Sequence, residues 1–250
     1  MLNDPVIAAL LAPKALVLLW TGAFVGGMAS GAAGFAYGIV ASALWLHTLD
    51  PLHTTMLVAA GGVLIQIGTV IPMRREIQIG RLAPFAVAGL IGIPVGAWLL
   101  IRIDANAMKT ALGVFLLVYG IYALAGPRLP HITGGGKLAD AGVGFAGGML
   151  GGIGGLSGVL PAIWCQLRGW PKEVSRGVYQ PFIIIAHIVT LTLIGTVALD
   201  RTGVILLACV LPVLMLGAFV GWRIYGRLDE RRFRQALAGL LVVSGAMLVI

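Results

Sequence analysis

The sequence predicts an all-α polytopic membrane protein built from two homologous halves, and three observations lead to this class. First, 59% of the 250 residues are hydrophobic and only 10% are charged. Second, charge-free runs close to the ~20 residues that cross a bilayer recur along the chain. Third, a glycine-rich sequence in the first half returns in the second, and an internal repeat of this length indicates a duplicated unit.

The repeat pairs "FVGGMASGAAG" (Phe24 to Gly34) with "FAGGMLGGIGG" (Phe145 to Gly155), with six identities at a shift of 121 residues. At the same shift "GAWLLIR" pairs with "GAFVGWR", and after a four-residue insertion "DANAMKTAL" pairs with "DERRFRQAL". The chain is therefore divided into a first repeat at 1–126, an inter-repeat loop at 127–137 and a second repeat at 138–250.

Each repeat holds one overlong glycine-rich segment and then three segments of ordinary length. The glycine-rich segments would be about 45 to 48 Å long as continuous helices, well beyond a bilayer core of ~30 Å, so they must tilt steeply or break. The predicted elements are the glycine-rich segment 15–46 with helices at about 54–73, 82–101 and 108–126, and the glycine-rich segment 138–167 with helices at about 177–199, 202–222 and 232–250.

The Lys and Arg residues favour one topology over another. If each glycine-rich segment crosses the membrane once, the seventeen basic residues divide ten against seven between the two faces. If each segment enters and returns as a re-entrant hairpin, they divide thirteen against four, which is the asymmetry that membrane proteins normally have. We therefore expect inverted repeats, with the loops at Arg74 and Arg168 on the same face.

The composition also disfavours several classes of protein. The net charge of +8 would suit nucleic acid, but the basic residues lie in short connections and are typical of topology signals, so we expect no nucleic-acid partner. Cys165 and Cys209 lie in apolar runs without metal-type spacing, so neither a disulfide framework, a metal site nor a cofactor is expected. The N-terminus lacks the basic start of a removable signal peptide. The expected partners are the lipid bilayer and a small anion, and the glycine faces leave room for a homodimer.

The glycine-rich stretches are candidate anion cradles. Broken-helix backbone at membrane depth frees N–H groups, and a helix start attracts anions. The alternative reading is small-xxx-small helix packing, as in Gly27-xxx-Gly31 and Gly148-xxx-Gly152. Ser157 stands where the first repeat has Ala36, so selectivity is expected there. The candidate backbone positions are Gly31, Gly34, Gly151, Gly152, Gly154 and Gly155.

Few polar side chains lie within the apolar segments. All nine carboxylates fall near segment ends, so none is placed to carry a proton or bind sodium at the midplane. Gln66 and His187 correspond at the repeat shift and are the best side-chain candidates, although a purely structural histidine fits His187 equally well. Arg176 and Gln180 share a helical face, and Arg176 is either an oxyanion ligand or a boundary residue.

An intramembrane protease is a rival hypothesis. Gly155 to Gly158 spells the GxSG of rhomboid-type proteases, and Ala186 with His187 resembles the dipeptide that carries their base, so Ser157 and His187 would form a nucleophilic dyad. The long duplication is foreign to that family, however, and Thr190 stands where it has glycine. We therefore expect no catalytic residues.

These residues suggest a known family. "GAFVGGMASGAAGFAYG", "GFAGGMLGGIGGLSGVLP", "WPKEVSRGVYQPF" and "GIPVGAWLL" resemble the sulfite exporter TauE/SafE family, also known as a sulfonate-uptake permease family, over nearly the whole chain. The resemblance implies transport of sulfite, sulfonates or sulfoacetate-like anions across the plasma or inner membrane. Many members carry a Thr-Ser pair after each glycine-rich element, where this chain reads "HTTML" and "SRGVY".

Energetics indicates a direction of transport. Moving one charge across 100 mV is worth about 2.3 kcal/mol, and an interior-negative potential drives anions outward. Export needs no coupling ion, and the sequence offers no midplane carboxylate to carry one. We therefore expect an alternating-access anion exporter, with an anion channel that uses the same glycine cradles as the alternative.

Overall fold

The computed structural model describes residues 12–125 and 132–225, together with isolated positions between 235 and 249. Within these residues the chain is helical and has no β-strand. The expected helix at 232–250 and part of the inter-repeat loop lie outside the continuously described ranges. Among the described residues, five helices are long and apolar enough to cross a membrane: α2, α4, α5, α9 and α10. The described elements are α2 (Pro13–Ala33), α3 (Tyr37–Trp45), α4 (Pro51–Val70), the short 3-10 helix η1 (Arg74–Glu76), α5 (Ile79–Leu100), α6 (Ala105–Ala125), α7 (Gly136–Gly154), α8 (Val159–Leu167), α9 (Lys172–Ala198) and α10 (Arg201–Tyr225).

Helices α4 and α9 begin earlier than the charge-free runs suggest. α4 begins at Pro51 because the Asp50 side chain accepts a hydrogen bond from the backbone N–H of His53, and proline suits the first position of a helix. α9 begins at Lys172, directly after Pro171, so its first turns hold charged residues. The apolar runs therefore predict where a helix can lie in lipid, and the caps decide where it starts.

Both glycine-rich segments are broken helices. Helix α2 ends before Gly34, which has a φ of 88°, and α3 starts at Tyr37. Helix α7 ends before Gly155, which has a φ of 70°, and α8 starts at Val159. Glycine takes these left-handed conformations without the steric cost that a Cβ would add, so each break falls at the last glycine of its run.

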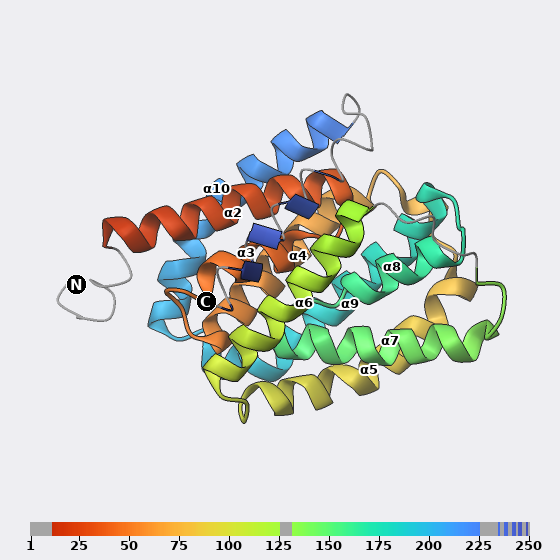
Figure 1. Cartoon of the computed structure of the whole chain (residues 1–250), viewed down its shortest axis with the longest axis horizontal. Helices are drawn as coiled ribbons and strands as arrows, with labels where there is room; N and C mark the ends of the chain where they lie inside the picture. Colours follow the sequence, from red (N-terminus) through yellow and green to blue (C-terminus); the bar gives the residue numbers. More distant parts are fainter. Residues whose placement is uncertain are drawn as a thin grey trace.

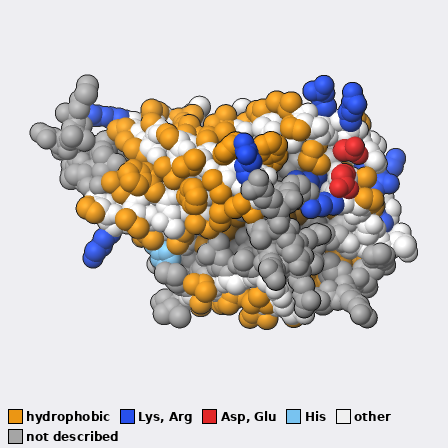
Figure 2. Space-filling view, turned by 90° about the horizontal axis from the view of Figure 1, so that it is seen from above, with side chains coloured by type: hydrophobic (Ala, Val, Ile, Leu, Met, Phe, Trp, Pro, Cys, Tyr) orange, Lys and Arg blue, Asp and Glu red, His pale blue; other side chains and the backbone are white. Residues whose placement is uncertain are grey.

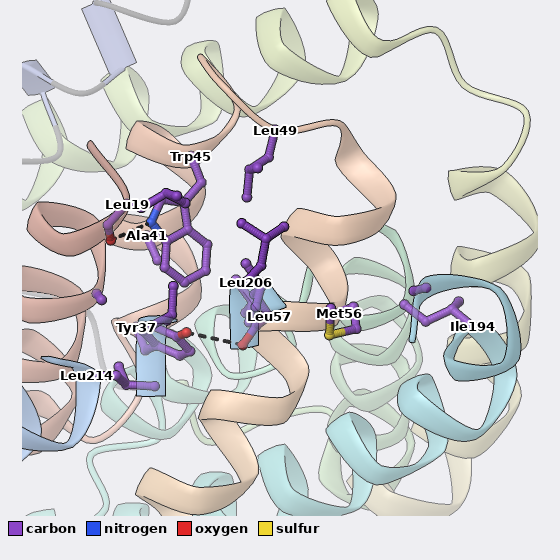
Figure 3. Close-up of a cluster of buried hydrophobic side chains, with 14 of the residues drawn as sticks. Leu19, Tyr37, Ala41, Trp45, Leu49, Met56, Leu57, Ile194, Leu206 and Leu214 are labelled. Carbon is purple, nitrogen blue, oxygen red and sulfur yellow. Dashed lines mark hydrogen bonds between the residues drawn. The ribbon is translucent and has the colours of Figure 1, made fainter. Parts of the chain in front are cut away.

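Helix α3 folds back along α2 to form the first helical hairpin. The indole Nε1 of Trp45 donates a hydrogen bond to the carbonyl of Leu19 at 3.0 Å, which ties the end of α3 to the first half of α2 (Figure 3). The hydroxyl of Tyr37 donates to the carbonyl of Leu57 on α4 at 3.1 Å. The two aromatic rings meet edge to face with centroids 5.9 Å apart, so the hairpin is anchored inside the protein at both ends of α3.

Helix α8 folds back along α7 to form the second hairpin, which is closed by charged groups. The indole of Trp164 donates to the carboxylate of Asp140 at 2.7 Å, and the guanidinium of Arg168 pairs with the same carboxylate at 2.9 Å. Arg168 also donates to three backbone carbonyls between residues 133 and 136. This network fixes the open end of the second hairpin.

Two helix pairs form opposite sides of the molecule, α2 with α10 and α5 with α7, while α4 and α9 pack against each other (Figure 1). In both pairs, glycines bring the two backbones together, because a Cβ at these positions would collide with backbone atoms of the partner helix. The contacts of the two pairs are equivalent: Gly92 with Phe145 and Gly217 with Phe24, then Gly96 with Met149 and Gly221 with Met28.

These contacts correct the repeat register in the fourth helix of each half. Phe145 lies 121 residues after Phe24, but Gly217 lies 125 residues after its counterpart Gly92. Pairing "GAWLLIR" with "GAFVGWR" is therefore wrong by four residues, and the structural match is "GIPVG" with "GAFVG". His187 still matches Gln66 at a shift of 121 residues, so the four-residue insertion lies between His187 and Gly217.

The two halves also touch at both ends of the molecule. At one end His53, in the first turn of α4, lies 2.6 Å from a carboxylate oxygen of Asp50 and 3.2 Å from one of Asp200, just before α10. The backbone N–H of Gly203 donates to Asp200 at 2.7 Å and lowers the pKa of its carboxyl, and His53 lowers it further. At the other end the guanidinium of Arg81 lies 4.6 Å from the ring centre of Trp170.

Figure 2 shows hydrophobic side chains over most of the described part of one face, with most charged side chains toward one end. Large apolar residues such as Val87, Ile91 and Trp98 on α5, and Leu216 and Phe219 on α10, are exposed. In a soluble protein such exposure would be costly, but it suits helices that face lipid.

Candidate functional site

Side chains from α4 and α9 cap the first helix break. The guanidinium of Arg176 donates to the carbonyl of Ala32, the hydroxyl of Tyr179 donates to that of Ala33 at 2.9 Å, and the amide of Gln66 donates to that of Gly34. The last carbonyls of a helix have no partner within it, and a cation there opposes the negative end of the helix dipole. The end of α2 is thus held from two sides.

The second break is capped in the same way by the counterparts of these residues. The hydroxyl of Thr55 donates to the carbonyl of Ile153 at 3.1 Å, and the ring Nε2 of His187 lies 3.1 Å from the carbonyl oxygen of Gly155. Thr55 and Arg176 are 121 residues apart, as are Ala32 and Ile153. Equivalent side chains therefore donate to equivalent carbonyls. Thr55 and Arg176 each donate to the hairpin of the other half.

The two breaks meet in the interior of the protein. A Cβ added at Gly38, in the first turn of α3, would lie 2.7 Å from the carbonyl oxygen of Gly155. A Cβ added at Gly158, directly before α8, would lie 3.1 Å from the Cβ of Phe35. The starts of α3 and α8 are therefore neighbours, and each brings N–H groups without an intrahelical partner and the positive end of a helix dipole.

Two buried polar side chains at the breaks have no hydrogen-bond partner among the described residues. Neither amide atom of Gln180 is paired, although the side chain is only 1% exposed, and a Cβ at Gly34 would lie 2.6 Å from its Nε2. The hydroxyl of Ser157, which is fully buried two residues before α8, is unpaired as well. Buried polar groups are normally satisfied, so these two side chains are candidates for contact with a bound molecule.

Other buried polar atoms without a partner lie on the surrounding helices. They are the hydroxyls of Ser42, Thr54 and Thr190 and the Nδ1 of His187. Within the described part of the chain, no three His, Cys, Asp or Glu side chains come together in a way that would hold a metal ion. The interior thus presents hydroxyls, amides and one guanidinium, which suits a small polar anion.

The structure brings most of the predicted site residues to the breaks: Gly34, Gly155, Gln66, His187, Arg176, Gln180 and Ser157. Arg176 is 5% exposed and donates to α2, because α9 starts early enough to carry this residue into the protein.

The remaining predicted glycines have different neighbours. Gly31 packs against the backbone of Ala218 on α10, and Gly152 against that of Ile93 on α5, so both lie in helix contacts. Gly151 packs against the Cβ of Ser157, while Gly154 faces the side chains of α6 and the break. Only the last glycine of each run adopts the positive φ at the break.

The two residues of the predicted protease dyad are not hydrogen-bonded to each other. The Oγ of Ser157 and the Nδ1 of His187 both lack a partner, and the Nε2 of His187 is used on the Gly155 carbonyl. In the described structure His187 contacts the helix break through the Gly155 carbonyl.

Thr55 was missed as a site residue because its role depends on a carbonyl 98 positions away. The signal was nevertheless present, since the repeat shift places Thr55 opposite Arg176. Tyr179 and Gly38 were missed for the same reason: what makes them part of the site is the approach of the other half.

The family model described as "Sulfite exporter TauE/SafE" matches residues 18–248, which spans both halves and both breaks. Comparison with curated proteins and with solved structures gave no match.

Proposed function

Because the chain belongs to the sulfite exporter TauE/SafE family of membrane transporters for sulfur-containing anions, we propose that it carries a small sulfur oxyanion by alternating access. The observation that supports this most directly is the meeting of two helix breaks around unpaired buried polar groups. Transporters built from repeats with discontinuous helices place the substrate where the half-helices meet.

The groups at the breaks have the chemistry of an anion site. The starts of α3 and α8 offer N–H groups, Gln180 and Ser157 offer unpaired donors, and Arg176 offers a guanidinium one helical turn from Gln180. Among the described residues the buried carboxylate is Asp140, and it is neutralised by Arg168 at the open end of the second hairpin. An oxyanion between the breaks would therefore meet donors and no buried competing carboxylate.

Contacts between the halves support inverted repeats with re-entrant hairpins. If both glycine-rich segments crossed the membrane, the starts of α4 and α10 would lie on opposite faces, yet His53 at the start of α4 contacts Asp200 at the start of α10. The same reasoning applies to Arg81 and Trp170 at the other end. Hairpins that enter from opposite faces and meet at their tips satisfy both contacts.

This topology can be tested by labelling. Single cysteines at the exposed positions 75 and 173 should react with a membrane-impermeant maleimide from the same side of the membrane, and a cysteine at position 201 from the other side. Labelling of 75 and 173 from opposite sides would contradict the inverted arrangement.

The direction that we propose is export, driven by the interior-negative potential. The test is flux of ³⁵S-sulfite in proteoliposomes with a potassium diffusion potential of either sign. Efflux should rise when the inside is negative, and sulfite on the far side should accelerate exchange, as a carrier requires. A flux no greater than in protein-free liposomes would refute sulfite transport, and the absence of acceleration would indicate a channel.

A further inference from the structure

The Gln180 side chain places a specific demand on the bound molecule. Its amide carries two N–H donors on Nε2 and an acceptor on Oε1, and neither atom has a partner in the described structure. A fully deprotonated oxyanion brings only acceptors. It would satisfy Nε2 but leave Oε1 buried beside negative charge, and an unpaired buried acceptor weakens binding.

We propose that the site selects a singly charged oxyanion that carries its own hydrogen-bond donor, such as hydrogensulfite or a hydroxy-substituted sulfonate, over a donor-free anion or a dianion. This rests on the proposed function, because it specifies the substrate of the same site. Nε2 donates a hydrogen bond to a sulfur-bound oxygen, and Oε1 accepts a hydrogen bond from the donor group of the ligand. The Ser157 hydroxyl, also unpaired, can donate or accept as the ligand turns.

The charges around the breaks favour the same choice. Arg176 is the buried cation at the first break, and its guanidinium is shared with the carbonyl of Ala32 at the negative end of α2. The desolvation cost of an ion grows with the square of its charge, so a dianion would lose roughly four times as much hydration free energy as a monoanion of similar size. One shared guanidinium suits one negative charge.

The test compares two probes with the same sulfonate group and the same charge. Isothermal titration calorimetry of the full-length protein in detergent micelles should give a Kd for 2-hydroxyethanesulfonate about 10 to 100 times lower than the Kd for ethanesulfonate. This is about the range expected when ethanesulfonate leaves one buried acceptor unpaired. In Gln180→Met, which keeps the side-chain length and removes the amide, the hydroxyl preference should fall to within about twofold. Gln78→Met, the same change at an exposed residue before α5, should leave the preference unchanged.

Each outcome decides the question. Equal affinities in the wild type would overturn the donor requirement while leaving sulfonate transport intact. A preference that survives Gln180→Met would overturn the role of Gln180, and if that variant fails to fold, the wild-type ratio decides alone. If only sulfite binds, its apparent affinity should rise and fall with the fraction of hydrogensulfite as pH changes. An apparent affinity that follows the fraction of the sulfite dianion would overturn the proposal. Failure of sulfite and both sulfonates to bind, together with absent flux, would refute the proposed function itself.

Discussion

The glycine contact between α5 and α7 allows a matched test of how the two halves are held together. A Cβ at Gly148 would lie 2.8 Å from the Cα of Gly89 and closer still to its carbonyl oxygen, whereas ordinary contact begins at 3.4 Å. Since backbone atoms cannot rotate away, Gly148→Ala must push the helices apart by at least about 0.6 Å, which forfeits about a quarter to a half of the local dispersion attraction. Overpacking of this kind costs about 1–3 kcal/mol.

Gly142→Ala is the control, because it lies in the same helix with no atom within 4 Å of its added Cβ. It should stabilise the protein by about 0.5–1 kcal/mol, the usual advantage of alanine over glycine in a helix. Gly148→Ala receives the same benefit, so its net loss should be about 1–2 kcal/mol and the two variants should differ by about 2 kcal/mol. The free energy of unfolding is measured in mixed detergent and SDS micelles by circular dichroism. Equal stabilisation by both substitutions would refute the close packing of α5 on α7.

Three further predictions follow from hydrogen bonds and ion pairs of the described structure. The backbone N–H of Gly203 and the His53 ring lower the pKa of Asp200. The ionised carboxylate therefore contributes stability above its unfolded pKa of about 3.9, and this contribution is lost as pH falls through the lower folded pKa. Asp200→Asn should reduce the fall in melting temperature on the acid side. Arg168→Ala leaves Asp140 buried without its cation and should cost about 3–5 kcal/mol in the same unfolding assay. Arg168→Met combined with Asp140→Leu removes the uncompensated charge and should recover part of the loss, while the indole of Trp164 stays without its acceptor. Thr55→Val removes the donor to Ile153 and should cost about 1 kcal/mol, while Thr54→Val, which removes an unpaired buried hydroxyl, should be neutral or stabilising; the opposite order would contradict the capping role.

The helices and the breaks could be predicted from sequence because their causes are local. Apolar runs of bilayer length predict spanning helices, and the glycine runs are too long for a continuous crossing. The match of Gln66 with His187 could also be found, since the repeat places both after a glycine-rich segment. These two residues then proved to bond the carbonyls of Gly34 and Gly155 in turn.

What each glycine contributes could not be predicted, because helix packing and helix breaking both use glycine. Gly31 and Gly34 lie in one run, yet one contacts α10 and the other ends α2. The difference depends on which face the neighbouring helix covers. The alignment of α10 with α5 likewise depends on the contacts of α10 with α2 and of α5 with α7. These contacts join residues far apart in the sequence, so the repeat alone could not predict them.

The two halves share a scaffold but differ in the chemistry that they bring to the breaks. The packing glycines and the capped carbonyls have counterparts in both halves, so exchanging the conformations of the halves would give a second state with similar contacts, which is what alternating access needs. The polar groups are not shared in this way. At the repeat shift Arg176 faces Thr55 and Gln180 faces Ala59, so the guanidinium and the unpaired amide both belong to α9. Under the proposed function, a symmetric scaffold with its guanidinium and unpaired amide on one helix would bind one anion rather than two, and that anion would stay with α9 as the surrounding halves exchange their conformations.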